Sequence, residues 1–188
     1  MNVDISLPSR FNQEGDKYLL RAKNVASKLM RRDRYAHKNT FGHVFLMGGS
    51  LGRTGAIAMA TQAALRTGVG LATAATWSDA LGLLAHQLPV EAMTFPIPDS
   101  ESKYSKYLEH LKTFSALVIG PGMGDRPEAR KLLEILMQNY QGPIVLDADA
   151  LNLISEFNLY KIEQELNESF PLIPLELGLV SVTDKVAI

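Results

Sequence analysis

The sequence contains no cysteine, and this absence excludes several kinds of chemistry. Disulfides, thiolate metal sites and cysteine nucleophiles all need a thiol, so none of them can operate here. A chain that makes no use of oxidised cysteine suits a reducing compartment, and we expect a cytoplasmic protein.

Net charge and long apolar runs are also scarce. The 188 residues carry 19 Lys and Arg against 20 Asp and Glu, which gives a formal net charge of −1. This balance gives no reason to expect nucleic acid as a partner. No stretch approaches the roughly 18 uninterrupted apolar residues of a membrane span, and the polar amino-terminal residues do not resemble a signal peptide. We therefore expect neither a nucleic-acid partner nor a membrane partner.

The length and composition predict one globular domain over residues 1–188, because 46% of the residues are apolar and 21% are charged. We expect residues 1–14 to form a flexible arm and 16–32 an amphipathic helix. Beyond these, strand-like runs alternate with helical patterns. The expected strands are 43–47, 71–77, 91–97, 116–119 and 144–146, and the expected helices are 55–67, 79–88 (with Ser78 as its N-cap), 103–113, 127–140, 149–155 and 161–169. Such alternation predicts an α/β fold with a mostly parallel sheet.

Three turns rich in glycine or aspartate each follow a strand-like run directly. They are residues 48–56, 120–124 and 147–152. Ligands of open α/β sheets bind beyond the carboxyl ends of the strands, so we expect the three turns to meet at one crevice. Glycines bring backbone N–H groups close to anions, and aspartates hold metal ions or activated water. The pattern therefore favours a phosphorylated substrate.

Each turn also has a purely structural interpretation. The first has the spacing Gly49, Gly52, Gly55, which is neither a Walker A loop nor a strict dinucleotide fingerprint. It is either an anion site at a helix N-terminus or a plain strand-to-helix turn, in which Arg53 and Thr54 contact phosphate or face water.

The second and third turns leave similar alternatives. Gly120-Pro121-Gly122 predicts a rigid platform of bare backbone, because proline fixes one φ angle while glycine adopts positive values. In the third turn, Asp147 and Asp149 polarise water or hold Mg²⁺, or else Asp149 caps a helix. The pair His37-Lys38 either reaches the crevice or lies on the surface.

In combination, these motifs resemble the ADP-dependent NAD(P)H-hydrate dehydratase family. The motifs that carry the resemblance, in the family's order between about residues 35 and 156, are His37-Lys38, Gly42-His43-Val44, residues 48–56, 63–66, 68–71, 120–124 and 147–152. The resemblance implies a ribokinase-like, three-layer α/β/α fold. It also implies a carbon–oxygen lyase that uses ADP or ATP with Mg²⁺ to remove water from hydrated NADH or NADPH, and a homotetramer.

The resemblance also implies which residues contact the substrate. These are Gly55, Ala56, Gly120, Gly122, Asp149 and Asn152. The family's catalytic aspartate and phosphate cradle come from a late Gly-x-Gly-Asp segment, which has no counterpart after residue 156. The catalytic residue is therefore not assigned, and we expect the sequence to be incomplete at its C-terminal end.

Two other functions remain open from the sequence. One is a small-molecule kinase of the ribokinase superfamily that acts on a vitamin-precursor alcohol. Such kinases share the expected fold and the same means of binding phosphate. The other is a truncated, non-catalytic nucleotide-binding module.

Overall fold

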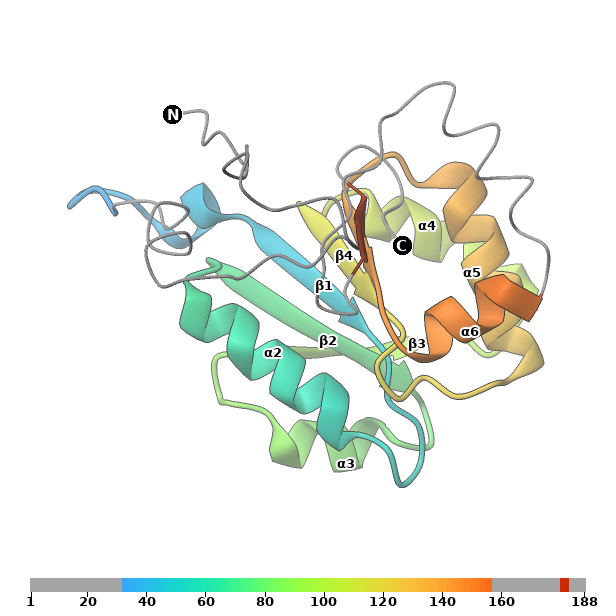
Figure 1. Ribbon diagram of the computed structural model, residues 1–188. Coiled ribbons are helices and arrows are strands. Elements are labelled where there is room, and N and C mark those ends of the chain that lie inside the picture. Colours follow the sequence, from blue (N-terminus) through green and yellow to red (C-terminus); the bar gives the residue numbers. More distant parts are fainter. Residues whose placement is uncertain (1–31, 157–179, 183–188) are drawn as a thin grey trace, which may run out of the picture. The chain divides into compact units, whose positions relative to one another are not determined.

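The computed structural model describes residues 32–156 and 180–182 (Figure 1). The chain divides into two compact units, Met1–Ala36 and His37–Ile188. The elements, all in the second unit, are η1 (Lys38–Phe41), β1 (His43–Met47), α2 (Gly55–Thr67), β2 (Leu71–Trp77), α3 (Leu81–Gln87), β3 (Met93–Ile97), η2 (Glu101–Lys103), α4 (Tyr104–Leu111), β4 (Ala116–Ile119), α5 (Pro127–Asn139), β5 (Ile144–Leu146), α6 (Asp149–Glu156) and β6 (Val180–Val182). The expected arm 1–14 and helix 161–169 lie outside the described residues, as does nearly all of helix 16–32. The single domain over 1–188 stays a prediction.

The strands form one sheet in the order β3-β2-β1-β4-β5-β6. The first five strands run parallel, and β6 pairs antiparallel with β5. Val44 lies at the centre of this arrangement, with Ala72 of β2 on one side and Ala116 of β4 on the other. The predicted α/β fold with a mostly parallel sheet is confirmed.

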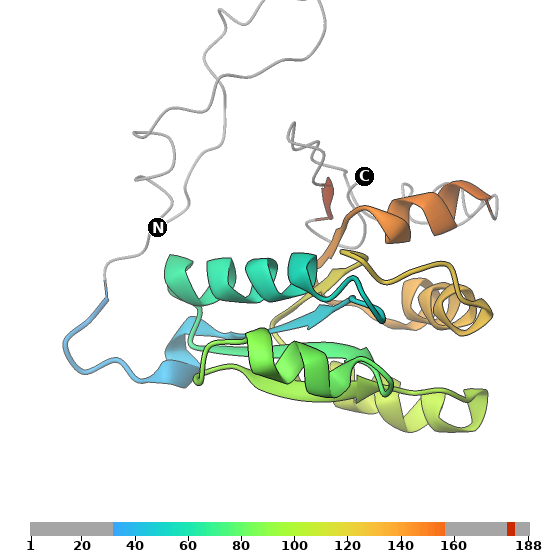
Figure 2. The ribbon, with the colours of Figure 1, turned by 90° about the horizontal axis from the view of Figure 1, so that it is seen from below.

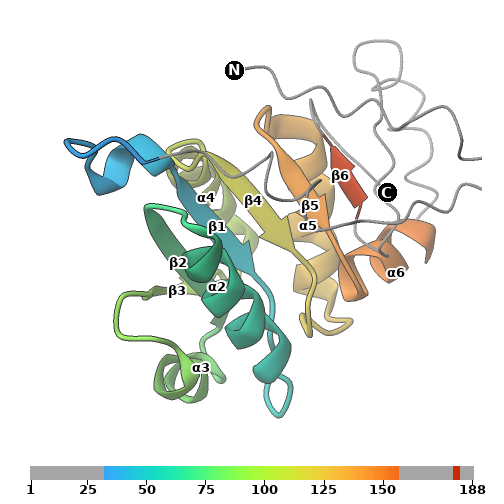
Figure 3. The same cartoon turned by 60° about the vertical axis from the view of Figure 1, so that its left-hand side comes forward.

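Helices cover both faces of the sheet. Alternate residues of β1 point to opposite faces, so Leu46 packs in one cluster with Ile57 of α2 and Leu84 of α3. Phe45 and Met47 belong to the other cluster, to which α4 and α5 contribute. Figure 3 shows α2 in front of the strands and α4 and α5 behind them, and in Figure 2 β1 lies between α2 and α4.

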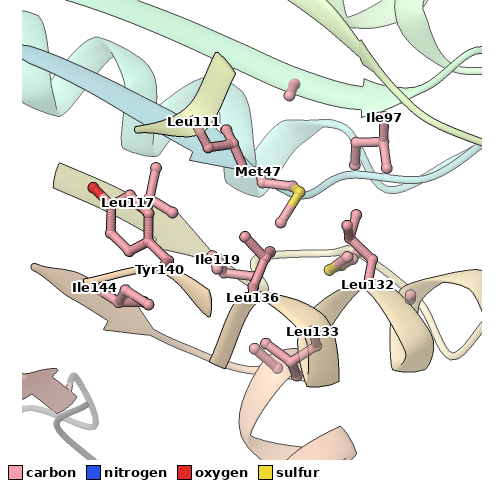
Figure 4. Packing of buried hydrophobic residues seen from close by; sticks show 14 of the residues in the cluster. Met47, Ile97, Leu111, Leu117, Ile119, Leu132, Leu133, Leu136, Tyr140 and Ile144 are labelled. Atoms are coloured by element: carbon pink, nitrogen blue, oxygen red, sulfur yellow. The ribbon is translucent and has the colours of Figure 1, made fainter. Parts of the chain in front are cut away.

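The larger cluster is built around α5. Its buried leucines include Leu132, Leu133 and Leu136, and Figure 4 shows Leu132 and Leu136 on the side of Met47 of β1 and Ile119 of β4. Apolar residues recur every three or four positions along α5, at Ala129, Leu132, Leu133, Leu136 and Met137. This spacing places them on one face of the helix, which is therefore the face that packs in the core. Because α5 directly follows the second glycine turn, this packing anchors one side of the turn.

Within the described residues, the predicted elements 43–47, 55–67, 71–77, 116–119 and 144–146 have the observed bounds, and the others differ by one or two residues at an end: β3 begins at Met93 rather than 91, and α4, α5 and α6 span 104–111, 127–139 and 149–156. Helix α2 spans 55–67 as expected, and Gly68 ends it in the left-handed conformation (φ 106°) that favours glycine. Helix α3 differs. It begins at Leu81 rather than 79, and its N-cap is Ala80 rather than Ser78. The reason is a tight turn in which the Ala80 N–H donates to the Trp77 carbonyl (2.9 Å), so Ser78 precedes the helix.

The order of the strands places a topological switch between β1 and β4. From β1 the chain moves through α2 to β2 and then through α3 to β3, and it returns through α4 to β4 on the other side of β1. The loops after β1 and β4 therefore diverge to opposite faces. A crevice at such a point is where open α/β sheets bind ligands.

His43 at the start of β1 gives the fold a predicted pH dependence. Burial and the nearby His110 charge lower its pKa below 6.5, and its Nε2 lies 2.8 Å from the Thr73 Oγ1. Below about pH 6.5 the unfolded chain binds the proton more readily, so we expect the free energy of unfolding to decrease as the pH falls from neutral. Urea denaturation across this range measures the slope. His43→Gln is expected to flatten it, whereas His86→Gln, at an exposed position, is expected to leave it unchanged.

Candidate functional site

The first and second turns contact each other through the backbone. The Gly49 N–H donates to the Pro121 carbonyl (2.8 Å), and the Ser50 Oγ donates to the Gly122 carbonyl (2.9 Å). The contact is too close for side chains, because a Cβ on Gly48 would lie 2.4 Å from the Pro121 oxygen. The loops after β1 and β4 therefore form one continuous edge at the switch point (Figure 1).

The second turn has the backbone conformation that the sequence predicts. Gly120, Gly122 and Gly124 have φ angles of 124°, 65° and 80°, in the region that side chains rarely enter. The Met123 N–H closes the turn on the Gly120 carbonyl (2.9 Å). The result is a compact loop in which Gly120, Pro121, Met123 and Gly124 are buried and Gly122 is half-buried.

The third turn joins the other two through Asp149. The Asp147 N–H continues the sheet pattern by donating to the Ile119 carbonyl (3.0 Å), and Ala148 then takes a positive φ of 48°. Asp149 follows, and its Oδ2 accepts the Gly124 N–H at 2.8 Å. Since α6 begins at Asp149 itself, that residue is not the N-cap of this helix. We name the assembly of residues 48–56, 120–124 and 147–152 the three-turn rim.

The six predicted substrate residues all lie on the three-turn rim, at different depths. Gly55, Ala56 and Asn152 are exposed, and Gly122 and Asp149 are half-buried. Gly120 is buried, and its N–H donates to the Met47 carbonyl (2.9 Å). The geometry brings the six residues to one edge of the sheet, with Gly120 in the junction beneath the exposed surface.

A second group of residues supports the rim and was missed by the sequence analysis. The Trp77 Nε1 donates to the Met123 carbonyl (2.9 Å), and the Thr76 Oγ1 donates to the Gly49 carbonyl (2.9 Å). The Arg126 guanidinium lies 5.1 Å from the centre of the Trp77 ring and pairs with Asp79 (2.7 Å). The sequence contains one signal that could have identified this group. Trp77 is the only tryptophan in the chain, and it is the last residue of a predicted strand.

His37 and Lys38 lie at the other end of the sheet. They flank the start of η1, which precedes β1, and both side chains are exposed. Because the rim follows the carboxyl ends of the strands, this pair is a surface feature and not part of the rim.

A groove of about 440 Å³ lies between β3 and α4, away from the rim residues. Its lining includes Phe95, Tyr107 and His110, with Lys103 and Lys106 at its side, and none of the six predicted residues. We take the rim as the candidate site, because the backbone groups suited to an anionic ligand gather there.

Within residues 32–156 and 180–182, no three His, Asp or Glu side chains form a group that could hold a metal ion. Over the same residues, no helix has the length and apolar character needed to cross a bilayer.

Comparison with known proteins identifies the family. The family model described as NAD(P)H-hydrate dehydratase matches residues 44–170. A bifunctional NAD(P)H-hydrate repair enzyme of Moorella thermoacetica is 38% identical over 161 residues, covering 81% of this chain and 30% of the relative. The ADP-dependent (S)-NAD(P)H-hydrate dehydratase of Streptococcus thermophilus is 36% identical over 136 residues, covering 71% of this chain and 47% of the relative.

Solved structures agree with this assignment. A ribokinase-like superfamily protein of Enterococcus faecalis superposes with a TM-score of 0.64 at 26% identity, covering 77% of this chain and 51% of the other. An ADP/ATP-dependent NAD(P)H-hydrate dehydratase of Bacillus subtilis, co-crystallized with ATP/Mg²⁺, superposes with a TM-score of 0.55 at 28% identity. The match covers 69% of this chain and 45% of the other. The fold is ribokinase-like, as expected, and the chain spans between 30% and 51% of the length of these four proteins. The matched segment contains all three turns, and the chain belongs to the NAD(P)H-hydrate dehydratase family.

Proposed function

We propose that the protein takes part in the ADP- or ATP-dependent dehydration of hydrated NADH or NADPH, as a carbon–oxygen lyase. The observation that supports this most directly is the three-turn rim at the switch point, inside the segment that matches the dehydratase family. Relatives at 36% and 31% identity are named ADP-dependent and ATP-dependent NAD(P)H-hydrate dehydratases.

The rim residues suit the binding part of this reaction. Gly55 and Ala56 open α2 at an exposed helix N-terminus, where N–H groups and the helix dipole favour a phosphate. No atom lies within 4 Å of the space that a Cβ on Gly55 would occupy, so a ligand can approach the main chain closely. Gly122, Asp149 and Asn152 lie on the adjoining turns. We assign to these residues the binding and orientation of the hydrated dinucleotide.

Among the described residues, no three His, Asp or Glu side chains form a group that could hold a metal ion. ADP or ATP with Mg²⁺ belongs to the proposal because relatives carry these names, and Mg²⁺ is commonly held by substrate phosphates and few carboxylates. The Gly-x-Gly-Asp segment expected to hold the nucleotide phosphates has no counterpart after residue 156. A homotetramer and a cytoplasmic location are part of the same proposal.

An assay of nicotinamide repair tests the proposal. Purified protein is mixed with hydrated NADH or NADPH, ADP and Mg²⁺, and recovery of the reduced-nicotinamide absorbance is followed together with phosphate release. We expect recovery that depends on both protein and nucleotide. Reactions without ADP, and with ATP in its place, serve as controls. No recovery, under conditions in which the Streptococcus thermophilus relative is active, would refute the function.

A second candidate is a non-catalytic module that binds the dinucleotide. The observation in its favour is that the three-turn rim supplies main-chain groups suited to binding, while no described residue is assigned a catalytic role. Titration calorimetry with hydrated NADPH separates the two functions, because a binding module gives a heat of binding without any turnover in the repair assay.

A further inference from the structure

The rim contains one charged contact that links all three turns. The Asp149 Oδ2 accepts the Gly124 N–H at 2.8 Å, and the Arg53 Nη1 lies 4.0 Å from the same oxygen. Arg53 belongs to the first turn, Gly124 to the second and Asp149 to the third. The two contacts of Asp149 differ greatly in strength, and this difference indicates separate tasks for the two charged residues.

Asp149 is held firmly in its place. A charge-assisted hydrogen bond of 2.8 Å to a main-chain N–H is short and strong, and the Asp149 side chain is only 25% exposed. The positive φ of Ala148 (48°), rare for a residue with a side chain, belongs to the turn that leads into Asp149. Without this carboxylate the half-buried Gly124 N–H would lose its acceptor.

Arg53 is anchored through its backbone and loosely held through its side chain. A Cβ on Gly122 would lie 2.4 Å from the Arg53 carbonyl oxygen, so the first and second turns meet at this residue. The Arg53 side chain is 63% exposed, and at 4.0 Å its contact with Asp149 is too long for a hydrogen bond. Such exposed ion pairs contribute little free energy, so the guanidinium can exchange partners readily.

We infer that Asp149 is a positioning residue that fixes the second turn, and that Arg53 binds a phosphate group of the ligand. The inference rests on the proposed function. A guanidinium suits this task because its planar fork donates two parallel hydrogen bonds to phosphate oxygens. Arg53 comes two residues before the exposed Gly55 in the sequence, and Gly55 and Ala56 form the N-terminus of α2, which favours the same anion. The hydrogen bond from the Gly124 N–H to the Asp149 carboxylate then stays intact while Arg53 turns from the carboxylate to the phosphate.

Two ligands of the proposed reaction carry phosphate groups, the hydrated dinucleotide and ADP or ATP. Arg53→Gln removes the positive charge and keeps a polar side chain. We expect the KM for one of the two substrates to rise about tenfold, with kcat within about twofold, because uniform binding is lost. A raised KM for the hydrate identifies the dinucleotide phosphate, and a raised KM for ADP identifies the nucleotide phosphate. Both KM values unchanged would overturn the assignment of Arg53.

Matched variants keep this result specific. Arg66→Gln removes an exposed arginine from the last turn of the same helix that Arg53 precedes, and we expect no change in either KM. Arg53→Lys keeps the charge without the fork, and we expect it to restore part of the affinity.

Two substitutions of Asp149 separate positioning from direct ligand contact. Asp149→Asn keeps an oxygen acceptor for the Gly124 N–H, so we expect a melting temperature close to that of wild type and a smaller loss of kcat/KM than in Asp149→Ala. Asp149→Ala removes the acceptor, and we expect kcat/KM to fall about tenfold or more together with a lower melting temperature. Equal losses in the two variants would show that the carboxylate charge itself is needed, and would overturn the positioning role.

The double variant Arg53→Gln/Asp149→Asn is the sharpest control. If Arg53 only neutralised Asp149, removing the carboxylate charge would cancel the effect of Arg53→Gln on KM. We expect the tenfold effect to persist, and cancellation would refute the phosphate contact. Failure of the proposed function is distinguishable, because it would appear as absence of turnover in the wild-type protein.

Discussion

Replacing Gly120 by alanine is expected to lower the free energy of unfolding by about 3 kcal/mol, one of the largest effects of any single substitution in this protein. Two causes add. Gly120 has a φ of 124°, which a residue with a Cβ rarely adopts. The new Cβ would also lie 1.8 Å from the Asp147 carbonyl oxygen and 2.7 Å from the Ala150 Cβ, so the second and third turns would have to separate.

Urea denaturation of Gly120→Ala, followed by circular dichroism, measures this loss. Gly82→Ala is the matched control, because Gly82 lies in α3 with no atom within 4 Å of the added Cβ and without a positive φ. In a helix, alanine is favoured over glycine by up to about 1 kcal/mol, so this variant is expected to be as stable as wild type or more stable. A Gly120→Ala protein as stable as wild type would contradict the close backbone approach at the rim.

Replacing Leu133 by alanine is expected to lower the free energy of unfolding by about 3 kcal/mol, through a different mechanism. Leu133 lies on α5, is 0% exposed and packs in the large cluster between α5 and the sheet (Figure 4). Truncation removes buried apolar surface and leaves a cavity that its neighbours fill only in part. Since α5 begins three residues after Gly124, a looser α5 is also expected to loosen the second turn.

Thermal and urea denaturation of two further variants separate burial from side-chain loss. Leu133→Met keeps nearly the same volume and is expected to cost less than about 1.5 kcal/mol. Leu83→Ala makes the same truncation on α3 at a residue that is 50% exposed, and we expect a change within about 1 kcal/mol. Equal losses for Leu133→Ala and Leu83→Ala would show that the core is not packed as described.

Local chemistry explains why several elements could be predicted from the sequence. The bounds of α2 follow from the glycines at both ends, since Gly68 can take the left-handed conformation that stops a helix. Strands β2 and β4 have the predicted bounds because apolar runs with turn residues on both sides leave few alternatives. The N-cap prediction for Ser78 was wrong because the turn from Trp77 to Ala80 outcompetes the serine side chain.

The role of Asp149 shows where local chemistry is insufficient. A carboxylate at the start of a helix indicates a cap, a metal ligand or a ligand contact equally well. Its partner, the Gly124 N–H, lies 25 residues earlier in the chain. No local signal connects the two, and the same holds for Ser50 with Gly122 and for Trp77 with Met123, which are 72 and 46 residues apart.

The sequence by itself determined the α/β class, the parallel strands and the three turns, because glycine conformation and apolar periodicity act over a few neighbouring residues. The family was indicated separately, by the resemblance of the ordered motifs to known sequences. Only the tertiary structure decided that the turns meet backbone to backbone and that Gly120 is the buried part of the three-turn rim. It also decided that His37 and Lys38 lie at the far end of the sheet. These facts depend on strand order. The return of the chain past β1 to form β4 brings the distant turns together, and it is set by the packing of whole helices on the two faces of the sheet.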